Sequence, residues 1–178
     1  MGEAFSRIAL AAGIFGFALS SSAQVTAHIG AGLGIPVGGL AGERQLGAGV
    51  SAGGGYNFGP RFSVMLDFAS ISLTVSPSLQ NVLPFTSDTI WSFSVDPYYR
   101  FMTGHRFQPY ISGGYGVYSV HSELTEKSVL KGGVNAGAGL GLQIGENSSI
   151  YFEARVSNIW VAGRNVTIVP FTVGFRWR

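Results

Sequence analysis

The chain has 178 residues, of which 27 are glycine and none is cysteine, and only 11% carry a charge. Soluble domains average about 25% charged residues, so this chain has few side chains with which to cover a water-exposed surface. The lack of cysteine excludes disulfides and thiolate metal sites. The formal net charge of +2, without a stripe of Lys and Arg, argues against a nucleic-acid partner.

Residues 1–23 have the three-part layout of a secretory signal peptide. Arg7 precedes an apolar run over residues 8–19, and a site of small residues ends at Ala23. The alternative is a membrane-anchoring helix, which requires about 20 apolar residues, and this run is shorter. We therefore expect cleavage after Ala23, so that residues 24–178 form the mature protein as a single domain.

Beyond residue 24, apolar and polar residues alternate with a period of two, which is typical of β-strands. Eight segments show this alternation, and their length of about 11 residues is what a tilted transmembrane strand needs. The predicted strands are residues 25–35, 45–58, 61–73, 89–102, 107–120, 131–144, 150–161 and 167–177.

The fourth segment shows the alternation most clearly. Pro97 within it cannot donate a ladder hydrogen bond, so we expect a bulge or a strand end there. In the fifth segment the glycines leave the facing of the side chains open. In the fourth, one face carries Trp91, Phe93, Val95, Pro97, Tyr99 and Phe101, and the other carries Ser92, Ser94, Asp96, Tyr98 and Arg100.

The seven connections fall into two groups of different length. Short turns on one side and long loops on the other are the signature of an outer-membrane barrel, with the short side in the periplasm. We therefore expect both ends of the mature chain in the periplasm. The short connections are 59–60, 103–106 and 145–149, and the long ones are 36–44, 74–88, 121–130 and 162–166.

Bulky apolar residues occupy one face of the predicted strands, and glycine, serine and a few charges occupy the other. A secreted soluble barrel or sandwich is the alternative, but it would turn the small residues toward water. Inside an eight-stranded barrel there is room for little more than side chains, which suits the small face. We predict an all-β fold, an eight-stranded antiparallel up-and-down transmembrane β-barrel of the bacterial outer membrane, with the bulky face toward lipid.

Six charged residues fall on the inward face, three of each sign. Buried charges persist when they are paired and hydrogen-bonded, so the balance predicts an ion-pair network that fills the lumen and leaves no wide pore. The alternative interpretation is a selective or proton-handling channel. The six residues are Asp67, Asp96, Arg100, Glu153, Arg155 and Arg176.

Seven aromatic residues lie near predicted strand ends, where aromatic girdles mark the membrane interfaces. An aromatic-rich sheet can also bind ligands, but no basic groove accompanies this one. We predict interfacial girdles formed by Phe58, Phe62, Phe101, Phe107 and Trp177 on the short-turn side and by Trp91 and Trp160 on the long-loop side.

Four stretches carry a resemblance to a known family: "RFQPYISGGYGVY" at 106–118, "NAGAGLGLQI" at 135–144, "YFEARV" at 151–156 and "FTVGFRWR" at 171–178. The chain resembles the small eight-stranded outer-membrane β-barrels of the OmpA/OmpX type. The resemblance implies outer-membrane lipid around the barrel and recognition of the C-terminal strand by the insertion machinery, and we expect a monomer. The last stretch departs from the family pattern because Arg178 follows the aromatic Trp177.

The third possible function is that of an enzyme. Some small barrels resemble lipid A deacylases, in which a His two residues before a Ser deprotonates the hydroxyl. Ser157 looks like part of that motif, but Arg155 takes the place of the His, and a guanidinium cannot act as a general base. The histidines His28, His105 and His121 are scattered over a strand, a turn and a loop start, which predicts neither a triad nor a metal site.

These observations predict a non-enzymatic barrel without a cofactor, in a structural or surface-interaction role. The alternative is a narrow channel for small molecules across the outer membrane. The longest loop stretch, residues 77–88, is polar and carries no recognisable ligand signature, so the sequence names no ligand.

Overall fold

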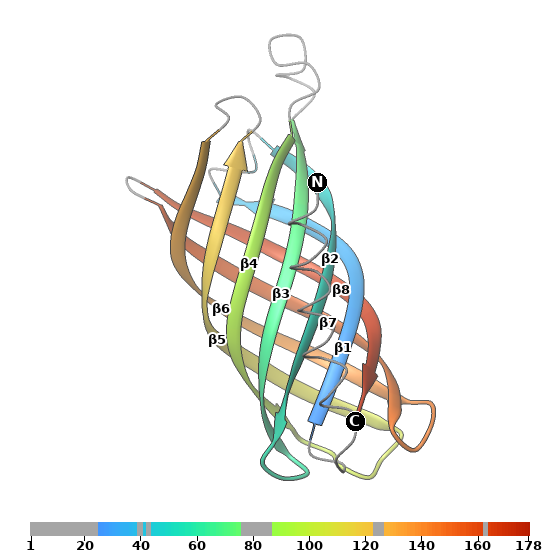
Figure 1. The fold of residues 1–178 in the computed structure, drawn as a ribbon. Helices are drawn as coiled ribbons and strands as arrows, with labels where there is room; N and C mark the ends of the chain where they lie inside the picture. The colour runs from blue at the N-terminus through green and yellow to red at the C-terminus, as the bar shows by residue number, and fades with distance from the viewer. Residues whose placement is uncertain (1–24, 39–40, 42–43, 76–86, 123–126, 162–163) are drawn as a thin grey trace, which may run out of the picture.

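The chain forms a closed barrel of eight strands, each paired with its neighbours in chain order (Figure 1). All eight pairings are antiparallel, and the last strand closes on the first. The computed structural model describes residues 25–38, 41, 44–75, 87–122, 127–161 and 164–178. The predicted architecture is confirmed, while the expected signal peptide at residues 1–23 lies outside the described residues.

The strands have 13 to 17 residues, whereas the segments predicted from the sequence have 11 to 14. Most of the extra length lies beside the long connections, where the ladders continue beyond the expected loop boundaries. Within the described ranges, no helix is both long enough and apolar enough to cross a membrane. The strands are β1 (Val25–Val37), β2 (Arg44–Asn57), β3 (Phe62–Val75), β4 (Ser87–Arg100), β5 (Phe107–Ser122), β6 (Lys127–Gln143), β7 (Ser148–Val161) and β8 (Arg164–Trp177).

Three short turns, at residues 58–61, 101–106 and 144–147, lie at one end of the barrel. The start of β1 and the end of β8 lie at the same end, because Ala27 pairs with Trp177. Gly104 in the second turn has a φ of 79°, a conformation that glycine adopts at no steric cost. This end is termed the turn end below, and the opposite one the loop end.

The outward face of the strands is bulky and apolar, as predicted. On β4 the side chains of Trp91 and Phe93 are 45% and 47% exposed, whereas Ser94 and Asp96 on the opposite face are 5% and 0% exposed. The fifth segment, whose facing the sequence leaves open, follows the same rule in β5, where Tyr110 is buried. A membrane-facing exterior and a filled interior follow from this arrangement.

Inward glycines make room for the large inward side chains. A methyl group on Gly139 would overlap the ring of Tyr110. A methyl group on Gly53 would overlap the side chains of Asp67 and His28. At these two positions only glycine leaves space for the tyrosine and for the charged residues, which offsets its entropic cost in a strand.

The expected bulge or strand end at Pro97 is wrong. Pro97 lies inside β4, and the register with β5 is the same before and after it, because Val95 pairs with Tyr115 and Tyr98 pairs with Ser112. The missing N–H removes one ladder hydrogen bond, but that loss does not require an extra residue in the strand.

The inner face is small and polar only in part, which corrects the sequence-based expectation. Toward the loop end, six buried apolar side chains from five strands fill the interior, and Ile71, Val120 and Val161 pack against them. The same alternation that points charges inward near the centre points these apolar residues inward near the loops. This apolar cluster consists of Leu73, Ile90, Tyr118, Ile159, Val166 and Ile168.

Candidate functional site

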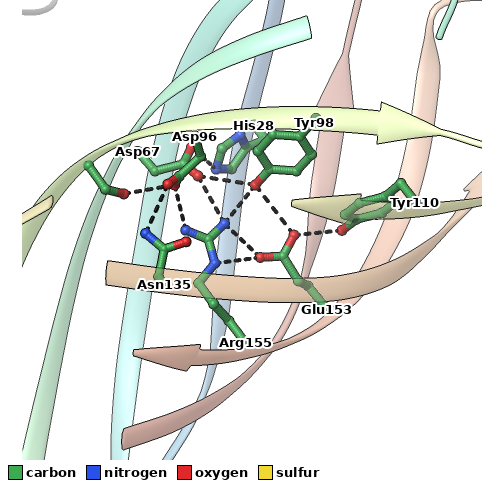
Figure 2. Close-up of polar contacts among 9 residues, drawn as sticks. His28, Asp67, Asp96, Tyr98, Tyr110, Asn135, Glu153 and Arg155 are labelled. Carbon is green, nitrogen blue, oxygen red and sulfur yellow. Dashed lines mark hydrogen bonds and ion pairs between the residues drawn. The ribbon is translucent and has the colours of Figure 1, made fainter. Parts of the chain in front are cut away.

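Arg155 projects from β7 into the barrel and binds three carboxylates (Figure 2). Its Nη1 donates to Asp96 Oδ2 at 2.7 Å and its Nη2 donates to Asp67 Oδ2 at 3.0 Å. Its Nε donates to Glu153 Oε1 at 2.8 Å. The carboxylates come from β3, β4 and β7, so one guanidinium joins strands that are far apart in the sequence.

The pair between Arg155 and Asp67 crosses the lumen. In a closed barrel of eight strands, β3 and β7 are four strands apart in either direction, and therefore face each other. The side chains of both residues are largely buried, at 15% and 7% exposure. A hydrogen-bonded ion pair thus stands where an aqueous pore would have to run.

Two tyrosines complete the hydrogen bonding of these charges. The hydroxyl of Tyr98 accepts from Arg155 Nη2 at 2.7 Å and lies 3.1 Å from Asp67 Oδ2 and 3.4 Å from Glu153 Oε2. The hydroxyl of Tyr110 donates to Glu153 Oε2 at 2.8 Å. Since both rings are 2% exposed, these bonds replace those that water would make.

Asp96 receives two further hydrogen bonds, from Asn135 Nδ2 at 2.8 Å and from Ser94 Oγ at 2.7 Å. Each carboxylate of the group is therefore held by several donors, which is how buried charges are tolerated. The central network is defined here as Arg155, Glu153, Asp67, Asp96, Tyr98, Tyr110, Asn135, Ser94 and His28.

His28 has an acidic partner that its position in the sequence does not reveal. Its Nε2 lies 3.3 Å from Asp67 Oδ1, and its ring packs edge-on against Tyr151 at 5.6 Å between centroids. Among the described residues, Nδ1 of His28 has no hydrogen-bond partner. The other two histidines lie elsewhere, His105 exposed in a turn and His121 near the end of β5.

The other two arginines of the six predicted inward charges stand apart from these carboxylates. Among the described residues, neither Arg100 nor Arg176 has an ion pair, although they are 2% and 4% exposed. Both terminal nitrogens of Arg100 lie 3.4 Å from Asn57 Oδ1. The guanidinium of Arg176 lies 4.7 Å from the ring centroid of Tyr110, within the range of a cation–π contact.

Arg176 is enclosed by aromatic rings, since its guanidinium also lies 4.8 Å from the centroid of Tyr151 and 5.4 Å from that of Tyr98. Tyr98 and Tyr110 are at the same time hydrogen-bonded to Glu153. Tyr98 and Tyr110 therefore contact both Glu153 and the guanidinium of Arg176. The structure places all six predicted charges inside, but brings only Asp67, Asp96, Glu153 and Arg155 together.

A cavity of about 80 Å³ lies between the central network and the apolar cluster. Its polar side includes His28, Asp67 and Arg155, and its apolar side includes Ile90 and Ile168. A space of this size holds no more than small molecules such as a few waters. In the part of the chain that the structure describes, no three His, Cys, Asp or Glu side chains gather as metal ligands would.

The seven aromatic residues predicted for the girdles all lie on the outer surface. Phe58 and Phe101 begin two of the short turns, Phe62 and Phe107 begin the strands that follow them, and Trp177 ends β8. Their exposed fractions are 66%, 43%, 49%, 56% and 42%, and those of Trp91 and Trp160, nearer the loop end, are 45% and 48%.

Sequence reasoning missed several residues that shape the interior. The alternation of the strands is consistent with an inward position of Tyr98, Tyr110 and the whole apolar cluster. It does not tell which of these side chains meet inside the barrel. The ion pair of Arg44 and Asp88, at 2.6 Å, joins β2 and β4 near the loop end. Both partners lie in stretches that were expected to be loop.

The sequence profile of a family described as "Outer membrane protein beta-barrel domain" matches residues 8–178. A comparison with curated protein sequences gives no match. Among solved structures, the neisserial surface protein A (NspA) is similar with a TM-score of 0.70 and 15% identity, covering 86% of this chain and 96% of its own.

Two structures from Pseudomonas aeruginosa are similar as well. The outer membrane protein OprG has a TM-score of 0.62 and 12% identity, covering 87% of this chain and 95% of its own. The N-terminal β-barrel domain of OprF has a TM-score of 0.53 and 17% identity, with coverages of 85% and 97%. At these identities the likeness establishes the fold.

Proposed function

Because the chain belongs to the outer membrane protein β-barrel domain family, we propose that this integral outer-membrane protein is a closed, non-enzymatic barrel with a structural or surface-interaction role. The central network and the apolar cluster fill its lumen. Lipid surrounds its bulky outer face, and its loop end is the part available to partners outside the membrane.

The observation that carries this proposal is the contact of Arg155 with Asp67 from the opposite wall. Around it, hydrogen bonds from Tyr98 and Asn135 hold the carboxylates in place. Opening a pore through this layer would leave charges unpaired in a narrow interior, which is costly. The network therefore supports a barrel that is shut at its centre.

The apolar cluster supports the same conclusion at a second level. Leu73 and Ile159 are both 0% exposed, so side chains without polar groups meet inside the barrel. An ion or a file of water molecules would find few hydrogen-bonding partners there. The two layers close the lumen by different means, one by pairing charges and the other by excluding water.

We propose a barrel without catalytic activity because of the surroundings of two side chains, Arg155 and His28. Arg155 is engaged by three carboxylates, and it cannot serve as a base in any case. His28 has Asp67 on one nitrogen, but within the described residues no hydroxyl is bonded to the other. A serine-type nucleophile requires that bond.

Planar-bilayer recordings of the purified protein test the closed barrel. We expect no stepwise conductance from the wild type, and openings once both layers are reduced in the double variant Arg155→Ala with Ile159→Ala. The matched control is Val156→Ala, which changes an outward residue between the two positions and should stay silent. Variants are first checked for folding by their heat-modifiable migration on gels.

The competing function is a narrow channel, and the cavity of about 80 Å³ is the observation in its favour. A channel needs that cavity to communicate with both ends of the barrel. Stepwise conductance of the wild type that changes when Arg155 is replaced would establish the channel and overturn the closed barrel.

The topology is part of the proposal. Residues 1–23 are removed on export, the turn end faces the periplasm, and the insertion machinery recognises β8, whose Phe175 and Trp177 point outward at 48% and 42% exposure. Closure leaves no free strand edge, so the barrel needs no partner to satisfy its backbone and is a monomer. On intact cells, protease should reach residues 77–88 and not the turn at 144–147; the reverse result contradicts this orientation.

A further inference from the structure

The part of the lumen next to the turn end holds positive charge without acidic side chains. In each strand, the two inward positions nearest that end carry no acidic residue, and the acids of the central network all lie further in. Three arginines on the inward alternation occupy this region: Arg100 at the end of β4, Arg176 near the end of β8, and Arg178 directly after β8. They are termed the turn-end arginines below.

The charges of the turn-end arginines lie close enough to act on one another. Arg178 and Arg176 both act on Arg100. Burial and the nearby charge of Arg176 lower the pKa of Arg178, which lies beyond the last strand. The backbone N–H of Arg178 donates to the carbonyl of Asn147 at 2.9 Å, which holds it against the third turn. Like charges repel at close range, so an anion among them would be stabilised by all three.

Two of the turn-end arginines have buried donors that no acceptor uses. Arg100 and Arg176 are 2% and 4% exposed, and the Nε of each has no hydrogen-bond partner among the described residues. The terminal nitrogens of Arg100 lie 3.4 Å from Asn57 Oδ1, which is long for a hydrogen bond. No ion pair within the described ranges includes Arg100, Arg176 or Arg178. Buried charged donors normally have acceptors, so this cluster is suited to an anionic one.

One carboxylate of the central network acts on the turn-end arginines from further inside. The charge of Glu153 acts on Arg176, but its oxygens accept from Arg155 Nε and from the Tyr110 hydroxyl, both at 2.8 Å. Arg176 itself lies over the ring of Tyr110. A carboxylate already bound by another arginine does not balance three guanidinium charges.

Two further arginines stand at the entrance to this part of the lumen. The carbonyl of Arg61 accepts from the backbone N–H of Arg100, and that of Arg106 accepts from the N–H of Gln143, both at 2.8 Å. Both residues continue the inward alternation of their strands, and their side chains are exposed. Among the described residues of the three short turns, the one acidic side chain is Glu146. An anion approaching this end therefore meets positive charge before it reaches the turn-end arginines.

We propose that Arg100, Arg176 and Arg178 form a binding site for a free phosphate ion inside the mouth of the barrel at the turn end. A guanidinium presents N–H donors in a fork that matches the oxygens of a phosphate, and a tetrahedral ion has oxygens for more than one arginine. In the topology proposed above, this mouth opens to the periplasm. The site does not depend on whether the lumen conducts.

Equilibrium dialysis with radiolabelled inorganic phosphate tests the site. The purified protein is folded in a detergent with sugar headgroups, so that no lipid or detergent phosphate competes. We expect saturable binding of about one phosphate per barrel. Sulfate, which is also a tetrahedral oxyanion, should displace it. Chloride at the same ionic strength should be at least about tenfold less effective, because it has no oxygens to accept the paired donors.

Arg178→Gln and Arg100→Gln each remove one guanidinium from the site. Each should weaken phosphate binding about tenfold or more, because hydrogen bonds between charged groups are lost. The matched control is Lys131→Gln, which removes the same charge near the loop end and should leave the affinity unchanged. Heat-modifiable migration shows for each variant that the barrel has folded.

Urea unfolding gives a second readout. In phosphate-free buffer, Arg100→Gln should be at least as stable as the wild type, because it removes a buried charge that forms no ion pair in the part of the chain that the structure describes. Phosphate should raise the urea midpoint of the wild type and leave that of Arg100→Gln unchanged. A merely structural arginine would give the opposite result, with a variant that is less stable in either buffer.

The absence of saturable binding by the wild type, or equal displacement by chloride, would overturn the proposal. So would an affinity that is unchanged in both arginine variants, or one that falls as far in Lys131→Gln. If Arg100→Gln does not fold, the more exposed Arg178→Gln decides the outcome. Because neither measurement involves conductance, failure of this site and failure of the closed barrel are distinguishable.

Discussion

The centre and the loop-end half of the barrel interior are filled in opposite ways. At the centre, Arg155 holds three carboxylates from both sides of the lumen. Four residues further along the same strand, Ile159 belongs to a cluster of side chains that are almost all apolar. One strand, with one alternation, can therefore contribute both to a charged layer and to an apolar layer in the same lumen.

The two layers respond differently to the loss of a single side chain. In the central network, removing one partner leaves the others charged and buried, which costs about 3–5 kcal/mol for a broken buried pair. In the apolar cluster, removing methyl groups leaves a void, which costs about 2–5 kcal/mol. The first layer depends on a complete set of charges, and the second depends on volume.

The largest effect is expected from Arg155→Met, which keeps most of the side-chain volume and removes the charge. Three carboxylates then lie close together with no cation among them, and we expect a loss of about 3–5 kcal/mol in the free energy of unfolding. Urea unfolding of the protein in lipid vesicles, followed by tryptophan fluorescence, measures this loss.

The matched control is Arg61→Met, which removes an exposed arginine that has no ion pair within the described residues. We expect that variant to stay within about 0.5 kcal/mol of the wild type. A loss below about 1 kcal/mol for Arg155→Met would mean that the carboxylates become protonated at little cost. The expected difference in stability between the central network and the apolar cluster would then disappear.

A smaller loss, of about 2–4 kcal/mol, is expected from Ile159→Ala, because this side chain is 0% exposed inside the apolar cluster. Its control is Val156→Ala, an outward residue at 48% exposure, where lipid fills the space that the methyl groups leave. The same urea titration gives both values. Similar losses in the two variants would show that the cluster is loosely packed.

The fold was predictable from the sequence because the physics that decides it is local. Alternation over about 11 residues, short turns against long loops, and bulky residues opposite small ones all appear along the chain, and each corresponds to a constraint of a membrane barrel. The strand ends near the loops were less predictable, since Arg44 and Asp88 look like loop residues until their ion pair is seen.

The partners of the inward charges were not predictable, because they depend on register and on side-chain length across the lumen. A balance of three acids and three bases suggests three pairs, yet Arg155 takes all three acids, and Arg176 lies among tyrosine rings instead. Alternation also places Tyr98 inward, but nothing in the sequence says that its hydroxyl meets Arg155.

The smallest of the three effects is expected from Tyr98→Phe, which removes that hydroxyl and keeps the ring. Arg155 Nη2 loses an acceptor at 2.7 Å, and Asp67 and Glu153 lose a shared donor. A hydrogen bond to a charged group contributes about 1.5–3 kcal/mol, so we expect a loss of about 1–3 kcal/mol in the same titration. The neighbouring Tyr99→Phe, on the outward face at 39% exposure, should change little.

The combination of Tyr98→Phe with Arg155→Met distinguishes a network from a set of separate contacts. If the hydroxyl acts through the guanidinium, its removal costs less once Arg155 is gone. The loss measured for the double variant then differs from the sum of the two single losses by about 0.5–3 kcal/mol. Ile159→Ala combined with Arg155→Met should instead give additive losses, because the two side chains lie about 13 Å apart along β7. Additivity in both pairs would mean that the central charges are held independently of one another, and that the two layers differ in polarity alone.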